Sequence, residues 1–229
     1  MGAALVAPFC CVPSMFDSLE VIVLDQLDRE LERRKHHFVR YADDCNIYVR
    51  SRRAGERVMA SITAFITTKL KLKVNQQKSA VARPWERKFL GFSFTANREP
   101  KRRIAPKAVL RFKAKVRELT SRTRGVSIER MAEELAQYLK GWLGYFGKCQ
   151  TPSVLQSLEE WTRRRLRSAI WKQWKRGPVR FAELQKRGVG KDLAAQTAGS
   201  AHGPWRVSRI LCKRFPVKIG ERDENAETR

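Results

Sequence analysis

The sequence predicts an α+β protein, in which an antiparallel sheet with helices on one face is followed by a basic, purely helical segment. Two observations predict this division. Up to about residue 100, runs of β-branched and aromatic residues alternate with apolar residues at helical spacing, which is typical of strands and helices packed in layers. Beyond Pro100 the apolar residues recur only every three or four positions, and residues 101–190 hold 23 Lys and Arg against 7 Asp and Glu.

The first predicted element is an amphipathic helix that ends near residues 33–35. Its apolar stripe consists of Leu24, Leu27 and Leu31. Two runs rich in β-branched and aromatic residues follow, at 38–41 and 45–49. Such runs are typical of strands, and the short interval between them predicts a tight turn.

A second amphipathic helix is predicted over residues 58–70. A short loop then leads to residues 88–94, which are predicted to form a pair of short strands bent at Gly91, where the missing Cβ allows a tight turn. Three further helices are expected over 109–119, 131–146 and 155–174, with breaks at Gly125 and at Thr151-Pro152.

The charge of the whole chain is strongly positive. Its 229 residues include 48 Lys and Arg against 23 Asp and Glu, a net charge of +25. An excess of this size indicates a polyanionic partner. The chain is 42% apolar, with eleven Phe and six Trp, which excludes a disordered basic tail. Nucleic acid is favoured over an anionic membrane, because aromatic residues interleave with the basic ones instead of forming one amphipathic face.

The cysteines and the first residues bear on the compartment. The five cysteines show no even spacing and no C-x-x-C pair, so neither a disulfide framework nor a zinc site is expected. The first sixteen residues are uncharged; they lack the basic start of a signal peptide and are too short to span a bilayer. The sequence therefore predicts a cytoplasmic protein without a membrane partner.

The turn between the two strand-like runs is Tyr41-Ala42-Asp43-Asp44. Adjacent carboxylates repel each other, and a pair of divalent metal ions would relieve that repulsion and use the carboxylates to align an in-line phosphoryl transfer. An ordinary surface turn also favours Asp, and for an isolated Asp-Asp pair that is the better interpretation. The surrounding blocks of sequence decide between the two.

Several blocks follow one another in a recognisable order: FVRYADDCNIYVRS, a helix, LKLKVNQQKSAV and RKFLGFSF. They resemble the second half of the palm of a group II intron reverse transcriptase. The basic segment from about residue 104 to 176, with YLKGWLGYFGKCQ at its centre, resembles the maturase-specific thumb of that family. The resemblance covers roughly residues 14–210.

The resemblance implies a division of the chain into four parts. Residues 14–100 would be the C-terminal part of the palm, with antiparallel strands and helices, and residues 101–176 a helical, RNA-binding thumb of three helices. Residues 1–13 match nothing in the family. Residues 177–229 would be a C-terminal extension, and their Gly, Pro and Ala content predicts loose order.

The resemblance also implies roles for the residues of the palm. Asp43 and Asp44 would be catalytic carboxylates that bind Mg²⁺. Lys78 would lie near the incoming nucleotide, where a cation neutralises triphosphate charge or protonates the leaving group; an ordinary exposed lysine is an equally good interpretation. The hairpin that holds the primer strand would consist of Phe89, Leu90, Gly91 and Phe92.

Basic side chains of the thumb would contact RNA phosphates and recognise the folded RNA by its shape. The predicted RNA-binding residues are Arg111, Lys113, Lys115, Arg117, Arg163, Arg164, Arg165, Arg167, Lys172, Lys175 and Arg176. A solvated helix face is the alternative for the arginine run. Trp142, Tyr145 and Phe146 could stack on bases, but their helical spacing favours core packing.

One expected part of the polymerase site is missing. Two-metal nucleotidyl transfer needs a further carboxylate, which the family supplies from an earlier palm strand, and the acids upstream of Asp43 lie in no strand-like run. The resemblance thus implies an N-terminally truncated fragment of an RNA-directed DNA polymerase and intron maturase that is not catalytic alone. The alternatives are a non-catalytic module that binds structured RNA and a non-functional remnant.

The partners follow from the same resemblance. They are intron RNA, an RNA/DNA primer-template and, in the intact family, a dNTP. A complementary fragment or a second copy of the chain would supply the missing part of the palm. The sequence does not separate an intron enzyme from a domesticated relative used in antiviral defence.

Overall fold

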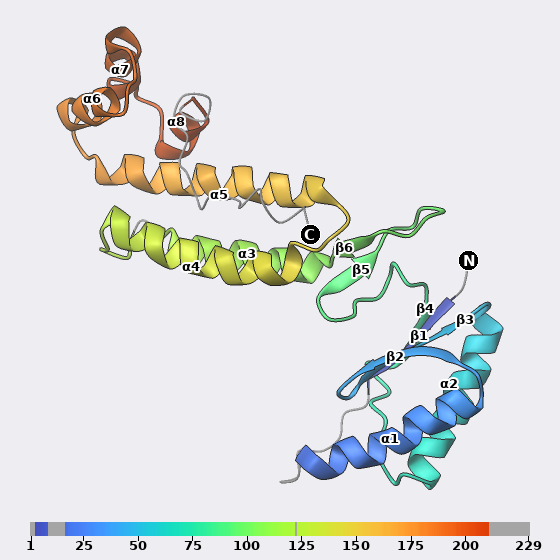
Figure 1. The fold of residues 1–229 in the computed structure, drawn as a ribbon. Helices are drawn as coiled ribbons and strands as arrows, with labels where there is room; N and C mark the ends of the chain where they lie inside the picture. Colours follow the sequence, from blue (N-terminus) through green and yellow to red (C-terminus); the bar gives the residue numbers. More distant parts are fainter. Residues whose placement is uncertain (1–2, 9–16, 122, 211–229) are drawn as a thin grey trace, which may run out of the picture. The chain divides into compact units, whose positions relative to one another are not determined.

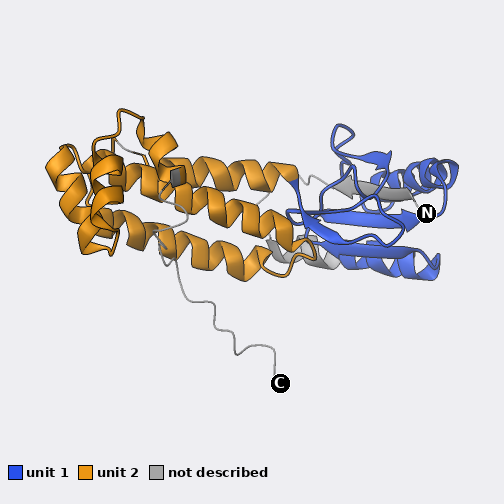
Figure 2. Cartoon of the chain, turned by 90° about the horizontal axis from the view of Figure 1, so that it is seen from above, with its two compact units in different colours: residues 1–105 blue, residues 106–229 orange. Residues whose placement is uncertain are grey.

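The computed structural model of the chain describes residues 3–8, 17–121 and 123–210 (Figure 1). The chain divides into two compact units, residues 1–105 and 106–229 (Figure 2). Unit 1 combines strands and helices, whereas the described part of unit 2 is helical. The predicted α+β class is therefore confirmed.

Unit 1 is built on a four-stranded sheet in the order β2-β3-β1-β4 (Figure 1), in which every neighbouring pair is antiparallel. The two predicted strands around the acidic turn are present as β2 and β3. The sequence did not predict β1 and β4, which complete the sheet on the far side of β3. The four strands are β1 (Ala3–Pro8), β2 (His37–Tyr41), β3 (Asp44–Val49) and β4 (Ala80–Ala82).

The two predicted helices of unit 1 are α1 (Asp17–Arg33) and α2 (Arg52–Thr68). Their apolar stripes pack on one face of the sheet against alternate residues of β3. The resulting core contains Leu24, Leu27, Leu31, Cys45, Ile47, Ile62, Ile66 and Leu70. This arrangement leaves the opposite residues of β3, Asp44 among them, on the face away from the helices.

Local signals fix the position of α2. Ser51 caps its first turn, because the Ser51 hydroxyl accepts a hydrogen bond from the Ala54 N–H at 3.2 Å. Gly55 allows the helix to approach β4 closely, since a Cβ atom at this position would lie 2.6 Å from the side chain of Val81. A larger residue there would push α2 away from the sheet.

A second, two-stranded sheet follows, formed by β5 (Phe92–Phe94) and β6 (Arg102–Ile104). The sequence predicted a strand pair within 88–94. In the structure only an isolated bridge joins Phe89 to Phe92, and the strand partner of β5 is β6, which lies beyond the predicted segment. All three residues of β5 pair with β6, as Phe92–Ile104, Ser93–Arg103 and Phe94–Arg102.

The described part of unit 2 contains the three predicted helices as α3, α4 and α5, and three shorter helices after them. Their bounds are α3 (Pro106–Leu119), α4 (Ile128–Phe146), α5 (Pro152–Gln173), α6 (Gly177–Lys186), α7 (Lys191–Ala198) and α8 (Pro204–Ile210). A single apolar core joins α3, α4 and α5 to the shorter helices, with Trp171, Met131, Leu135 and Leu184 among its most buried side chains.

The loose order predicted from residue 177 is wrong for residues 177–210, which form α6, α7 and α8. The reason is packing: Leu184, Ala194 and Val207, one from each helix, are fully buried in the core of unit 2. The rest of the predicted extension, 211–229, lies outside the described residues. Among the residues that are described, no helix is both long and apolar enough to cross a membrane.

Candidate functional site

The acidic pair lies at the tip of the hairpin formed by β2 and β3. Tyr41 pairs with Asp44, so Ala42 and Asp43 form a two-residue turn. Ala42 has a φ of +50°, in the left-handed region that two-residue hairpins require. Asp43 is exposed in the turn, while Asp44 is half-buried at the start of β3.

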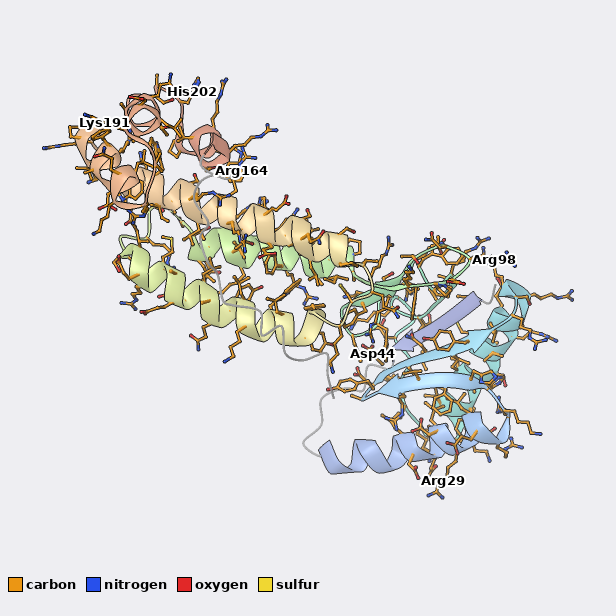
Figure 3. The ribbon with its side chains drawn as sticks, turned by 45° about the horizontal axis from the view of Figure 1, so that its top comes forward. Arg29, Asp44, Arg98, Arg164, Lys191 and His202 are labelled. Carbon is orange, nitrogen blue, oxygen red and sulfur yellow. The ribbon has the colours of Figure 1, made fainter. Side chains whose placement is uncertain are left out.

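The side chain of Asp44 lies on the sheet face that the helices leave free (Figure 3). Cross-strand partners share a face, so Tyr41 and Val39 of β2 lie on this same face. Their exposed fractions are 63% and 47%, which is unusual for apolar and aromatic side chains in a sheet. The carboxylates therefore border an open strip at the β2 edge of the sheet, formed by Val39 and Tyr41, whereas Asn46 on the same face is buried.

Neighbouring charges of both signs act on the pKa of Asp44. Burial raises the pKa of Asp44, and the neighbouring charge of Asp43 raises it further, whereas Lys78 and Lys88 lower it. Two lysines thus lie close enough to the acidic pair to act on it electrostatically. Lys78 was predicted from the sequence. Lys88 was not, because only the folding of the intervening loop brings it to Asp44.

Hydrogen bonds shape the loop that carries these lysines. The Lys78 N–H donates to the side-chain oxygen of Asn75 at 3.1 Å, and the Arg87 guanidinium donates to the Lys78 carbonyl. Farther along, the Ser93 hydroxyl donates to the Trp85 carbonyl at 3.1 Å. These hydrogen bonds hold the segment on either side of β4, which positions Lys78 and Lys88.

The two aspartates fit a hard divalent cation as part of its ligand set. Carboxylate oxygens are the ligands that Mg²⁺ prefers, and a cation between Asp43 and Asp44 would relieve the repulsion that raises the pKa of Asp44. Within the described part of the chain, no three His, Cys, Asp or Glu side chains gather into a metal-binding group. The residue of β1 opposite Asp44 is Pro8.

The predicted primer-binding residues form a tight turn. The backbone amides of Phe89 and Phe92 each donate to the carbonyl of the other at 2.9 Å. The two residues between them, Leu90 and Gly91, have φ values of +50° and +78°, which is the pattern of a type I′ turn. Leu90 is exposed at the tip of this turn, in a conformation that is strained for a residue with a branched side chain.

The predicted RNA-binding cations of unit 2 fall into two groups. In the first, the side chains are exposed on α3 and around the end of α5. This group consists of Arg111, Lys115, Arg117, Lys172, Lys175 and Arg176. Lys115 also pairs with Glu118 at 2.7 Å, and Arg117 lies over the ring of Trp161, together with the half-buried Lys113. These cations remain accessible to a polyanion.

The second group is the arginine run of α5, and its guanidinium groups are engaged inside the protein. Arg164 stacks on Trp205 and donates to the Trp205 carbonyl at 3.1 Å. Arg165 donates to the Thr120 hydroxyl at 3.1 Å. Arg163 pairs with Glu159 at 2.6 Å. The contacts of Arg164 and Arg165 tie α5 to neighbouring segments, whereas the Arg163–Glu159 pair lies within α5. The three cations are therefore only partly available to RNA.

Arg167 does not suit the predicted contact with RNA. It is 2% exposed and donates from Nε to the Ser208 carbonyl of α8 at 3.2 Å. Its place in the sequence, within a run of arginines, gave no sign of this burial. The packing of α8 over α5 covers it.

The aromatic residues of α4 also differ in how far they are buried. Trp142 packs against the core of unit 2, with its ring 4.4 Å from that of Phe112 and 4.8 Å from that of Phe146. Core packing was the favoured interpretation for these residues. Tyr145 contacts the edge of Phe146 at 4.8 Å but is 51% exposed, so of the three aromatic residues considered for base stacking it presents the most surface.

Comparison with known families agrees with this arrangement. Residues 8–94 match the family model described as reverse transcriptase (RNA-dependent DNA polymerase), and residues 109–188 match the model described as the maturase-specific domain of group II introns. No curated protein matches the chain. The first match includes the acidic turn and the Phe89–Phe92 turn, and the second begins within α3 and includes α4, α5 and α6. The chain therefore belongs to the family of group II intron reverse transcriptases and maturases.

Proposed function

We propose that this chain binds structured RNA through the exposed cations of unit 2, and that Asp43 and Asp44 supply part of a divalent-metal site in unit 1. The bound RNA would be an intron RNA, whose splicing the chain assists, or a primer-template. The observation that carries the proposal is that the chain combines two features: an acidic turn beside exposed residues of the sheet in unit 1, and a strongly basic helical unit 2. The acidic turn lies within the match to the reverse transcriptase model, and the predicted RNA-binding cations lie within the match to the maturase-specific model.

In unit 1 the proposed chemistry is nucleotidyl transfer. Mg²⁺ held by Asp43 and Asp44 would stabilise the charge that develops on the attacking and leaving oxygens. Lys78 and Lys88 would attract the triphosphate of a dNTP, and Lys78 would give a proton to the departing pyrophosphate. Leu90, at the tip of its turn, would contact the primer strand together with Phe89, Gly91 and Phe92.

The chain would not perform this chemistry alone. The described residues contain no third acidic ligand beside Asp43 and Asp44, and two-metal transfer needs one. We propose that a complementary chain or a second copy provides it. A primer-extension assay on the purified chain tests this: no cDNA is expected, and cDNA synthesis that disappears with Asp43→Asn would overturn the proposal.

A non-catalytic RNA-binding module is the second candidate function. It is favoured by the exposed cations of unit 2, which lie on helices that share no residue with the acidic turn. Filter binding to a structured RNA across a salt series tests this candidate function. Affinity should fall steeply with salt and survive the double substitution Asp43→Asn and Asp44→Asn, whereas a flat salt response contradicts both candidates.

The compartment proposed for this function is the cytoplasm, which the cysteine spacing in the sequence predicts.

A further inference from the structure

Arg40 lies on β2, directly before the acidic turn, and its side chain lies on the helix-covered face of the sheet. Its cross-strand partner is Cys45, which is fully buried against α1 and α2. The side chain of Arg40 is only 18% exposed. A cation in this position needs partners within the protein.

The guanidinium of Arg40 has two partners on different elements. Its Nε and Nη2 atoms donate to the two carboxylate oxygens of Asp28 on α1, the first at 2.8 Å. Its Nη1 atom donates to the backbone carbonyl of Ala42 at 3.1 Å. A planar fork can make these contacts simultaneously, whereas a lysine ammonium cannot. Arg40 thus links helix α1 to the turn that carries Asp43.

The contacted residue, Ala42, is the strained one in the turn. Its φ of +50° is unfavourable for any residue with a Cβ atom, so this conformation needs support from the surroundings. The hydrogen bond from Arg40 supplies such support at the carbonyl that joins Ala42 to Asp43. A change at that peptide would rotate the backbone of Asp43 relative to Asp44.

We propose that Arg40 is a positioning residue of the metal site. It touches neither carboxylate. Through the Ala42 carbonyl it holds the turn in the conformation that presents Asp43 and Asp44 to the same cation, and Asp28 holds Arg40 in place. The inference rests on the proposed metal binding by these aspartates. It assigns to the ion pair between Asp28 of α1 and Arg40 of β2 a role in metal affinity, which an ion pair that only joins the helix to the strand would not have.

The test uses the full chain and Mn²⁺ as the probe. Mn²⁺ affinity is measured by titration with EPR detection for the wild type, Arg40→Lys, Asp28→Asn and Asp43→Asn/Asp44→Asn. Arg29→Lys is the matched control, because Arg29 pairs with Asp25 at 2.9 Å on the same helix and is exposed. The amide signals of Ala42 and Asp43 are recorded by NMR without metal, on chain labelled at Ala and Asp.

In the expected result, the wild type binds Mn²⁺ and the double aspartate variant does not. Arg40→Lys weakens Mn²⁺ affinity about tenfold, the scale seen for residues that orient metal ligands, while Arg29→Lys leaves it unchanged. The Ala42 and Asp43 signals move in Arg40→Lys and Asp28→Asn but not in Arg29→Lys. Adding Ala42→Gly to Arg40→Lys restores part of the affinity, because glycine adopts positive φ without strain.

Two other results separate the inference from the proposed function. Wild-type Mn²⁺ affinity in Arg40→Lys, or Ala42 and Asp43 signals at their wild-type positions, overturns the positioning role while metal binding stands. Absence of aspartate-dependent Mn²⁺ binding in the wild type overturns the metal site itself, and the positioning role with it. If Arg40→Lys unfolds in a thermal melt, Asp28→Asn, which keeps the arginine, decides by the same two readouts.

Discussion

The guanidinium of Arg164 lies over the indole ring of Trp205, 4.0 Å from the ring centroid. Arg164, labelled in Figure 3, belongs to α5 and Trp205 to α8, so this cation–π contact joins two helices that are far apart in sequence. The same guanidinium also donates to the Trp205 carbonyl. The sequence predicted that the arginine run of α5 binds phosphates. In the structure, Arg164 of this run holds α8, the last described helix, in place.

Loss of the Arg167 guanidinium should destabilise the protein. Arg167→Met keeps most of the side-chain volume but leaves the Ser208 carbonyl without its donor. We expect the free energy of unfolding to fall by about 2 kcal/mol, the usual scale for a hydrogen bond to a charged group. Urea denaturation followed by circular dichroism measures this.

The exposed cations at the end of α5 should behave in the opposite way. Lys175→Gln with Arg176→Gln should leave the urea midpoint unchanged and lower the affinity for structured RNA. The slope of log K against log salt should fall by about two units if both residues contact phosphates. A reduced slope in Arg167→Met, or an unchanged slope in the double variant, would show that this division of the cations is mistaken.

Stability should depend on pH through Asp44. Its pKa is raised by burial and by Asp43, so the folded state binds the proton more tightly than the unfolded state. The free energy of unfolding accordingly falls as pH rises from the ordinary range of an aspartate through the raised pKa. Asp44→Asn should remove this component and stabilise the metal-free chain at pH 7, by about 0.5 kcal/mol on the scale of a repulsive pair.

Thermal melts of wild type and Asp44→Asn in EDTA, at pH 4 and pH 7, measure this effect. The advantage of the variant should be larger at pH 7 than at pH 4. A variant less stable than wild type at pH 7 would mean that the attraction of Asp44 to Lys78 and Lys88 outweighs its burial and its repulsion by Asp43.

Cys45 should resist alkylation in the folded protein. It is fully buried between the sheet and the helices, and burial raises the pKa of its thiol to about 12. The reactive thiolate is therefore scarce at pH 8. Iodoacetamide labelling followed by peptide mass spectrometry should modify the half-buried Cys149 before Cys45, and Cys45 only after urea is added. Equal labelling of Cys45 and Cys149 in buffer would contradict the packing of unit 1.

The backbone of Leu90 should be strained, and its side chain should contact the primer strand. Leu90→Asn gives the Asn-Gly pair that type I′ turns favour, and we expect it to stabilise unit 1 by about 1 kcal/mol. It should also weaken binding of a primer-template duplex, if the exposed Leu90 contacts the primer as proposed. Gly91→Ala is the converse control and should destabilise, since Gly91 has a φ of +78°. Unchanged stability in both variants would remove the argument for strain.

The local sequence pattern was sufficient to predict a helix or strand wherever the apolar residues of that element recur at a regular spacing. The leucine stripe of α1 and the β-branched runs on either side of Asp43-Asp44 predicted α1, β2 and β3, because spacing at 3.6 and 2 residues decides which side chains share a face. Pattern failed for β1, whose residues from Ala3 to Pro8 carry no alternation of polar and apolar residues. This strand exists through its ladders to β3 and β4.

The sequence by itself determined the family, the α+β class and the position of the acidic pair at a hairpin tip, since each rests on local patterns of residues or on the order of such patterns along the chain. The tertiary structure alone decided which cations are available. Lys88 comes near Asp44 through a folded loop, Arg40 reaches both Asp28 and Ala42, and Arg167 is buried under α8. The physical reason is that the environment of a charge is set by the elements packed against it, which local sequence does not record.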